Sequence, residues 1–294
     1  MAWYRGPGNE LSAMNILSIQ SQVVYGHVGN SAAQFILQRL GHEVWAVPTT
    51  LFSSHLAKPS WTGKLVPQAD IAALLDGLAD LGVLDRVDAV MTGYLGEAGN
   101  VAVIADLIDR LHRQRPHLIY ACDPVMGDNG KLYVTPALAD AIAAKLVGRA
   151  DILLPNQFEL QRLSGIAAID QSTTIAASRI LRERHGMTAV VATGVLNSAV
   201  PNKITALATS ATGVWAASGQ RTDVPASGAG DSFAALLLGH YLRQRHLPES
   251  LTAAVAGTSA IFAATAKLGR DELAIIDSQE IWANQAPDAA RQLT

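Results

Sequence analysis

The segment Gly228-Ala229-Gly230-Asp231 is the clearest candidate for chemistry, and it stands directly before an apolar run at 232–238. Two glycines allow a tight turn whose amides point at one spot, and a following helix adds its unpaired amides and positive dipole end. Such a site holds an anion without a lysine. Asp231 could then take a proton from a hydroxyl while the amides stabilise a phosphoryl group in transfer. An ordinary loop with Asp231 as a helix N-cap remains an alternative for this segment alone.

Two further clusters could bind a metal ion with a nucleotide. Asp123 and Asp128 flank the turn Pro124-Val125-Met126-Gly127, where carboxylates could bind Mg²⁺ directly or through water, although a solvated turn is the alternative. Asn156 and Glu159 are spaced i, i+3 where a strand gives way to a helix, so they share one face and could meet a hydrated metal and phosphate oxygens. The same pair fits a capping box, and the two interpretations are compatible.

Other phosphate-binding motifs are absent from the sequence. No Gly-x-x-x-x-Gly-Lys-[Ser/Thr] occurs, because Gly63-Lys64 and Gly130-Lys131 are each followed by leucine. No Gly-x-Gly-x-x-Gly follows the first expected strand, which argues against a nucleotide-linked dehydrogenase. The formal net charge of −3 argues against a nucleic-acid binder, which is usually basic, whereas a phosphorylated substrate needs only local positive potential.

Composition and cysteine usage indicate a cytoplasmic protein with a large aliphatic core. Of the 294 residues, 49% are hydrophobic and 5% aromatic, so the core is built mainly from Ala, Leu, Val and Ile. The single cysteine, Cys122, excludes an intramolecular disulfide and a cysteine metal cluster, and its simplest interpretation is a buried, inert side chain. We find no apolar run of membrane-span length and no secretory signal, so we expect no membrane association.

Alternating patterns predict a three-layer α/β/α fold with a mostly parallel central sheet. Short aliphatic runs, typical of buried parallel strands, occur at Asn15–Gln20, Val44–Thr49, Val87–Thr92, Leu118–Asp123, Asp151–Leu154 and Ala189–Thr193. Helical patterns lie between them, at Asn30–Leu40, Gln68–Asp80, Asn100–Gln114, Thr135–Leu146, Asn156–Leu163 and Ser172–Arg184. This spacing forms βαβ units, in which ligands bind beyond the carboxyl ends of the strands.

Two regions depart from this alternation. Lys203–Thr209 and Thr212–Ala217 predict a hairpin that adds antiparallel edge strands late in the chain, and long helices follow at Asp231–Arg243 and Pro248–Ala266. Residues 50–67 have no clear period, and a long irregular stretch in a compact domain predicts a binding loop or lid.

The chain is expected to form one domain. No linker rich in Pro, Gly or Ser divides it, so the domain is placed at 14–286. Residues 1–13 form an extension ahead of a second possible start at Met14, and 287–294 are expected to form a loose tail.

Taken together and in this order, the three clusters resemble those of the ribokinase superfamily. The N-terminal part is more specific and is similar to pyridoxal kinases, from about residue 15 to about residue 266. The segments that carry this similarity are Ile19-Gln20-Ser21-Gln22-Val23-Val24-Tyr25-Gly26-His27-Val28-Gly29-Asn30-Ser31-Ala32-Ala33, Phe52-Ser53-Ser54-His55, Trp61-Thr62-Gly63 and Thr92-Gly93-Tyr94-Leu95-Gly96.

The resemblance implies ATP-dependent phosphorylation of the 5′-hydroxymethyl group of pyridoxal, and of pyridoxine and pyridoxamine, in vitamin B6 salvage. It implies Asp231 as the base, with an anion hole formed by Gly228, Ala229 and Gly230. The vitamin would contact Asp231 together with Ser21, His55, Trp61 and Tyr94. Nucleotide contacts are implied for Asp123, Asn156, Glu159, Thr193 and Gly194, and Mg²⁺ ligands for Asp123, Asp128 and Glu159. A homodimer is also implied, and K⁺ as a second, monovalent cofactor stays open.

Three features depart from the family pattern. Leu56 and Ala57 follow the lid histidine where polar residues are expected, and Gln22 stands where a histidine is common. The loop 218–227, expected to run over ATP, is short. These differences concern substrate preference and turnover rather than the centre of phosphoryl transfer.

Two related functions remain as alternatives. One is a hydroxymethylpyrimidine kinase of the same superfamily, against which Tyr25-Gly26-His27 and Phe52-Ser53-Ser54-His55 argue. The other is a non-catalytic pyridoxal phosphate binder of the same fold, against which the presence of Asp231 argues.

Overall fold

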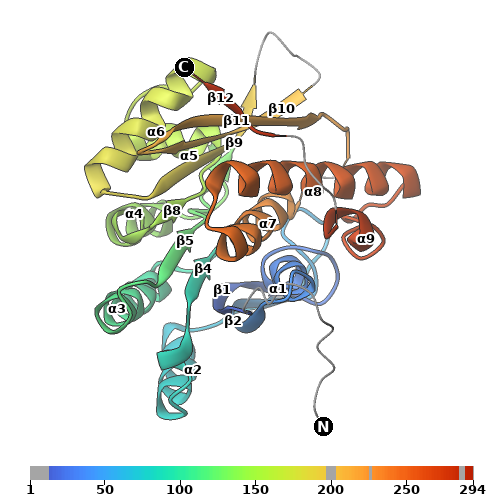
Figure 1. The fold of residues 1–294 in the computed structure, drawn as a ribbon. Helices are drawn as coiled ribbons and strands as arrows, with labels where there is room; N and C mark the ends of the chain where they lie inside the picture. Colours follow the sequence, from blue (N-terminus) through green and yellow to red (C-terminus); the bar gives the residue numbers. More distant parts are fainter. Residues whose placement is uncertain (1–12, 197–202, 225–226, 285–288, 294) are drawn as a thin grey trace, which may run out of the picture.

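The computed structural model describes residues 13–196, 203–224, 227–284 and 289–293, and among them one ten-stranded sheet forms the centre of the molecule. Its strand order is β12-β11-β10-β9-β8-β5-β4-β1-β2-β3 (Figure 1). The run from β9 to β2 is parallel, as predicted. Its members are β1 (Asn15–Val23), β2 (Glu43–Phe52), β4 (Ala89–Thr92), β5 (Ile119–Cys122), β8 (Ile152–Leu153) and β9 (Ala189–Leu196).

Antiparallel strands extend the sheet at both edges. The predicted late hairpin is confirmed as β10 (Lys203–Ser210) and β11 (Gly213–Gln220), which continue from β9. The expectation of a loose tail is wrong for Arg291–Leu293, which pair with β11 as β12. The expectation of a wholly irregular 50–67 stretch is also wrong, because β3 (Gly63–Leu65) pairs with the end of β2. Three-residue strands carry too short a pattern to be recognised from sequence.

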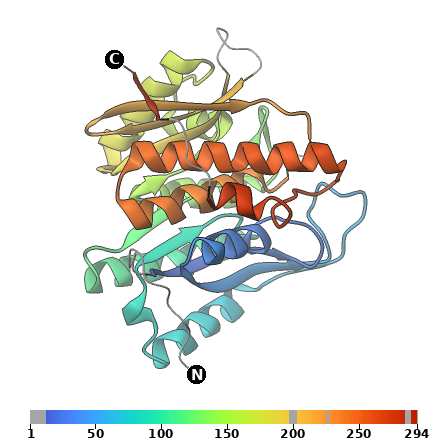
Figure 2. The ribbon, with the colours of Figure 1, turned by 45° about the vertical axis from the view of Figure 1, so that its right-hand side comes forward.

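Helices cover both faces of the sheet and complete the predicted three layers (Figures 1 and 2). One face carries α1 (Asn30–Arg39), α7 (Ala229–Gln244), α8 (Leu247–Leu268) and the short α9 (Gln279–Trp282). The other carries α2 (Gln68–Asp80), α3 (Ala98–Gln114), α4 (Pro136–Lys145), α5 (Gln157–Ser164) and α6 (Gln171–His185), with 3₁₀ turns at Leu84–Arg86 and Val147–Arg149. A separate small hairpin, β6 (Gly127–Asp128) and β7 (Lys131–Leu132), follows β5.

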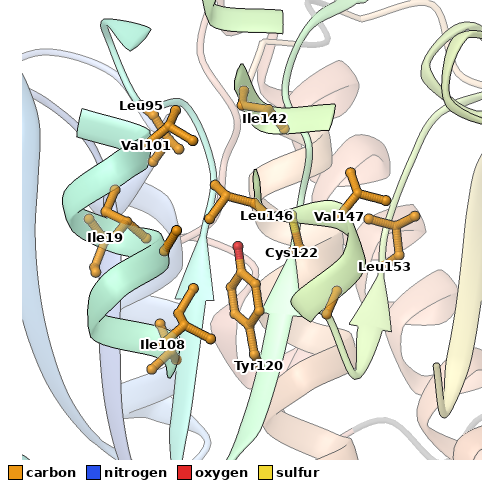
Figure 3. Packing of buried hydrophobic residues seen from close by; sticks show 14 of the residues in the cluster. Ile19, Leu95, Val101, Ile108, Tyr120, Cys122, Ile142, Leu146, Val147 and Leu153 are labelled. Atoms are coloured by element: carbon orange, nitrogen blue, oxygen red, sulfur yellow. The ribbon is translucent and has the colours of Figure 1, made fainter. Parts of the chain in front are cut away.

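The core on the α3–α4 face is aliphatic, as the composition indicates, with one large aromatic at its centre (Figure 3). Tyr120 is fully buried, and its hydroxyl lies 2.9 Å from Thr92 Oγ1, so its polar end is satisfied. Cys122 is also fully buried, and burial raises the pKa of its thiol to about 12. The prediction of an inert cysteine therefore agrees with its surroundings.

Helix α8 corrects one expectation from the sequence. It is long and apolar enough to cross a membrane by length and composition, with a mean hydropathy of 1.4, whereas no run of that length was expected. Its buried residues, including Leu251 and Ile261, lie on the side that packs against α7 and the strands β10 and β11. The core helix of a globular domain has the same composition, and this packing accounts for it.

Candidate active site

Three carboxylates from different elements meet beyond the carboxyl ends of the parallel strands. Asp123 follows β5, Glu159 lies in the first turn of α5 and Asp231 in the first turn of α7. Burial raises the pKa of Asp123 well above its usual value, and the neighbouring charges of Glu159 and Asp231 raise it further. Among the described residues, none of the three forms an ion pair with a cationic side chain. The three acids therefore lack a compensating charge, and their ionisation is disfavoured without a ligand.

Glu159 is held rigidly by the backbone around it. Its Oε1 accepts hydrogen bonds from the amides of Met126 (2.8 Å) and Gly127 (3.4 Å), and its Oε2 from the amide of Asn156 (3.0 Å). Burial raises the pKa of Glu159 to about 7, even though these amides oppose the shift. The carboxylate consequently has a fixed direction before any ligand arrives.

Asn156 has the capping-box role that its sequence position permits. Its Oδ1 accepts from the Glu159 amide at 3.0 Å, and its Nδ2 donates to the Gly127 carbonyl at 2.7 Å. The side chain therefore ties α5 to the β6–β7 hairpin and orients Glu159. Its predicted contact with phosphate oxygens stays a prediction.

The carboxylates fit a magnesium ion that is bound partly by the protein and partly by the phosphates of a nucleotide. Within the described ranges, no three His, Cys, Asp or Glu side chains are close enough to hold a metal by themselves. Mg²⁺ prefers oxygen ligands and usually keeps waters and substrate phosphates, so Asp123 and Glu159 need only supply part of its shell. Asp128 is exposed in the hairpin, where its carboxylate accepts from the Asn129 amide at 2.7 Å. Its charge raises the pKa of Glu159, so an outer position near the metal suits it.

The glycine motif forms a left-handed turn that leads into α7. Gly228 has φ 84° and is the N-cap residue, without a side-chain cap. Asp231 is the third residue of the helix, so the alternative of Asp231 as N-cap is wrong. A Cβ on Gly228 would lie 1.8 Å from the His27 carbonyl oxygen, whereas one on Gly230 would lie 3.8 Å from Asp123 Oδ2. Only a glycine is compatible with this turn at 228.

The loop between β1 and α1 joins the predicted base to the predicted vitamin contact. Burial raises the pKa of the half-buried Asp231, and a hydrogen bond from the Gly29 amide partly offsets this. Gly29 also packs on Ser21, since a Cβ on Gly29 would lie 2.3 Å from Ser21 Oγ. Ser21 sits where the pairing of β1 with β2 shifts register between Gln20 and Gln22. The structure therefore brings Ser21 and Asp231 close to the same glycine.

The predicted pocket residues lie on the neighbouring loops. His55 and Trp61 belong to the lid, residues 53–62 between β2 and β3, and Tyr94 follows β4. The Trp61 ring is 44% exposed and lies 4.8 Å from the Phe52 ring. Tyr94 is half-buried, which raises the pKa of its hydroxyl. His55 is nearly buried, with Nε2 2.9 Å from Glu272 Oε1.

Thr193 and Gly194 lie in the second half of the neighbouring strand β9. The Thr193 amide donates to the Pro155 carbonyl at 3.0 Å, and Thr193 forms a parallel bridge with Asn156. Gly194 is exposed with φ 70°. The two residues therefore lie beside the start of α5, on the same edge of the sheet as Glu159.

Two residues near the site were missed from the sequence. Tyr133 follows β7 and is 54% exposed; the part that is buried, and then the charges of Glu159 and Asp123, raise its pKa. The only sign of Tyr133 in the sequence was its position shortly after Gly130-Lys131, which does not complete a phosphate-binding Gly-Lys-[Ser/Thr] motif. Glu272 had no signal at all, because its partners are far away in the chain.

Comparisons with known proteins agree with this geometry. A family model for phosphomethylpyrimidine kinase matches residues 66–275. A pyridoxal kinase PdxY of Deinococcus radiodurans is 42% identical over 275 residues, which are 90% of this chain and 91% of that protein. One of Corynebacterium diphtheriae is 40% identical over 273 residues, 92% of this chain and 96% of that protein. The chain belongs to the pyridoxal kinase family.

Solved pyridoxal kinases share the fold. The enzyme of Leishmania donovani in complex with ADP and pyridoxamine matches with a TM-score of 0.88 at 26% identity, covering 95% of this chain and 99% of that one. Its complex with ADP and pyridoxine matches with a TM-score of 0.87 at 27% identity, over the same shares of the two chains. The expectation of a ribokinase-like fold is confirmed.

Two departures from the pattern of pyridoxal kinases have visible consequences. Gln22, which replaces a common histidine, donates from Nε2 to Ser31 Oγ at 2.8 Å and so is used in bracing the first turn of α1. Leu56, which replaces a polar lid residue, is 43% exposed. Neither change touches the Asp123, Glu159 and Asp231 cluster.

Proposed function

We propose that the protein transfers the γ-phosphoryl group of Mg·ATP to the 5′-hydroxymethyl group of pyridoxal, pyridoxine and pyridoxamine, with Asp231 as the base. Pyridoxal kinase activity in vitamin B6 salvage follows from the family; the vitamer range and the residue roles are the proposal. The observation that carries it is that the loop between β1 and α1 packs on Ser21 through Gly29 and on the Gly228 turn, which leads into Asp231, through the His27 carbonyl.

The geometry supports a direct transfer. The Asp231 carboxylate, oriented by the Gly29 amide, takes the proton of the substrate hydroxyl. The hydroxyl oxygen then bonds to the γ-phosphorus, and the bond from that phosphorus to the bridging oxygen breaks, with ADP leaving with the electron pair. The unpaired amides after Gly228, at the start of α7, stabilise the charge on the transferring group. Mg²⁺ held by Asp123, Glu159 and Asp128 would neutralise phosphate charge.

The remaining roles follow the same placement. Ser21 would contact the polar edge of the pyridine ring, and the aromatic side chains would line the vitamin pocket: His55, Trp61 and Tyr94. Thr193 and Gly194 would lie along the nucleotide phosphates. We further propose a cytoplasmic homodimer, testable by light scattering, and comparison of K⁺ with Na⁺ buffers decides whether a monovalent ion is required.

One assay separates this function from its alternatives. The protein is incubated with Mg·ATP and each B6 vitamer, and formation of the 5′-phosphate is followed. We expect product with pyridoxal. Turnover of a pyrimidine alcohol without turnover of any vitamer would reassign the substrate to that of a hydroxymethylpyrimidine kinase, which the family model also covers. Vitamer binding without turnover of either class would identify a non-catalytic binder.

A further inference from the structure

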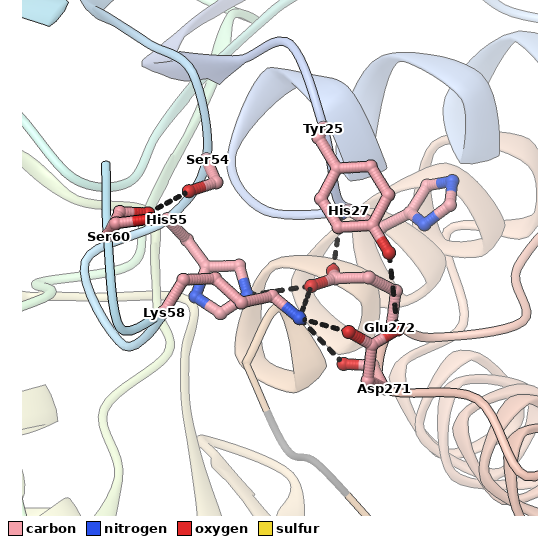
Figure 4. A network of polar contacts seen from close by, with 8 residues as sticks. All are labelled: Tyr25, His27, Ser54, His55, Lys58, Ser60, Asp271 and Glu272. Atoms are coloured by element: carbon pink, nitrogen blue, oxygen red, sulfur yellow. Dashed lines mark hydrogen bonds and ion pairs between the residues drawn. The ribbon is translucent and has the colours of Figure 1, made fainter. Parts of the chain in front are cut away.

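The side chain of Glu272 joins three segments that are far apart in the sequence (Figure 4). It lies in the stretch that follows α8 and is only 9% exposed. From the lid, His55 Nε2 approaches its Oε1 at 2.9 Å and Lys58 Nζ at 2.6 Å. From the loop before α1, the His27 amide donates to its Oε2 at 3.2 Å. One carboxylate therefore binds the lid to the loop that packs against the catalytic turn.

The contact with His27 leads directly to the glycine motif. The His27 carbonyl oxygen is the atom that a Cβ on Gly228 would meet at 1.8 Å, and Leu273 Cδ1 is 3.5 Å from the same position. Glu272 therefore holds the His27 amide, and its neighbour Leu273 lies beside the contact between His27 and Gly228. Two residues further on, the Gly29 amide favours the charged form of Asp231 and so lowers its pKa. Displacement of the Glu272 side chain would consequently move the loop on which Asp231 and Ser21 depend.

The contact with His55 decides which ring nitrogen is available. A carboxylate at Nε2 favours the proton on that nitrogen, because Nε2–H can then donate to it. His55 Nδ1 is left as an acceptor, and it is buried without a hydrogen-bond partner among the described residues. A buried acceptor without a partner is costly, and a donor group on a bound vitamin would relieve that cost.

The carboxylates at this place have donors within the protein. Burial raises the pKa of Glu272, but hydrogen bonds from Lys58 and His55 outweigh this and bring the pKa below its usual value. Lys58 also pairs with Asp271 at 2.8 Å, and Tyr25 donates to Asp271 at 3.2 Å. Both oxygens of Glu272 already accept from donors of the chain, so a positioning role suits it better than ligand binding.

We propose that Glu272 is a positioning residue for vitamin binding, which acts through His55: it holds the lid in place and keeps Nδ1 of that histidine as the acceptor for a donor group of the substrate. This inference rests on the proposed function of the site. It assigns a role to a residue outside every motif of the sequence analysis.

The test compares Glu272→Gln with Asp271→Asn. Asp271 shares the Lys58 partner but is 71% exposed and does not contact the histidine, so it is the matched control. We expect Glu272→Gln to raise the KM for pyridoxal about tenfold, as loss of a supporting carboxylate does elsewhere, with the KM for Mg·ATP within about twofold. Asp271→Asn should change neither. A merely structural role would lower Tm and the active fraction, without this separation of the two KM values.

A double-mutant cycle tests the route through the histidine. If Glu272 acts through His55, Glu272→Gln adds little to the KM increase already caused by His55→Gln. Glu272→Asp keeps the charge and should restore part of the affinity, and it replaces the glutamine variant if that one does not fold. Full additivity, or a pyridoxal KM unchanged in Glu272→Gln, would overturn the inference.

Failure of the proposed function gives a different result. Calorimetric binding of pyridoxal, with a non-hydrolysable ATP analogue present, measures the same affinity ratio without turnover. Wild-type protein that binds pyridoxal but does not phosphorylate it would refute the catalytic proposal and still test Glu272. Wild-type protein that does not bind pyridoxal at all would overturn both.

Discussion

Two groups of carboxylates lie at the same end of this molecule, and they differ in whether a partner offsets their charge. The transfer cluster, Asp123, Glu159 and Asp231, has no cationic partner among the described residues. Burial raises the pKa of each member, and repulsion from the other two raises that of Asp123 further. In the lid clamp, defined as Tyr25, His55, Lys58, Asp271 and Glu272, each carboxylate has a donor or cation, and the pKa values of both acids lie below their usual range.

The difference indicates what each group is for. Uncompensated negative charge costs stability in the free protein and is retained where a ligand supplies the balancing charge, which in the proposed function is the Mg²⁺ of Mg·ATP. A paired carboxylate holds segments together and leaves nothing for a ligand. Burial of an acid by itself therefore does not identify a catalytic residue; the presence or absence of its partner does.

The largest effect is expected at Asp231. Asp231→Asn keeps the shape of the side chain but removes the base, so kcat should fall by at least about 100-fold with little change in nucleotide affinity. Steady-state kinetics and ATP-analogue binding measure the two quantities. Turnover equal to wild type would remove Asp231 from the transfer cluster's function.

The next effect concerns the turn shared by both groups. In Gly228→Ala the new Cβ meets the His27 carbonyl, so we expect turnover to fall by at least about tenfold as the loop is displaced. Gly165→Ala is the control, because its φ of 79° is similarly left-handed but a Cβ there meets nothing within 4 Å. That variant should lose about 1 kcal/mol of stability and keep its activity. Equal activity of the two variants would contradict a role for the turn geometry.

The Mg²⁺ concentration that the enzyme requires shows how much Asp123 and Asp128 each contribute to metal binding. Asp123→Asn should raise the Mg²⁺ concentration for half-maximal rate about tenfold, because a direct ligand is lost. Asp128→Asn should raise it by only about twofold, since that carboxylate is exposed and bonded to Asn129. Excess chelator should abolish turnover by the wild type. The reverse order of the two variants would move Asp128 into the inner position.

The smallest expected effects are on the free energy of unfolding. They test the comparison most directly, because the two variants should change this quantity in opposite directions. Without ligands, Asp123→Asn should raise the free energy of unfolding by about 1 kcal/mol, since it relieves repulsion. Glu272→Gln should lower it by about 1 kcal/mol, since it breaks a satisfied network. Urea unfolding at equal m-values gives both numbers. Changes of the same sign in both variants would break the distinction between the two groups.

Long-range contacts explain what could not be predicted. The periodicity located α2 with its bounds correct, because the hydrophobic pattern of an amphipathic helix begins and ends with the helix. The capping box at Asn156 could also be predicted, because it depends only on residues three positions apart. Strands β3 and β12 were not recognised, since three residues hold no period and their existence depends on a partner strand.

The sequence by itself determined the three-layer fold, the family, and the motif that ends in Asp231, because each is a local pattern of residue types. Only the tertiary structure decided that Gly228 rather than Asp231 caps α7, and that a glutamate 217 positions from His55 holds the lid. The physical reason is that the pKa and the pairing of an acidic side chain depend on the groups around it. Whether a carboxylate is paired or left for a ligand depends on side chains that only folding brings together.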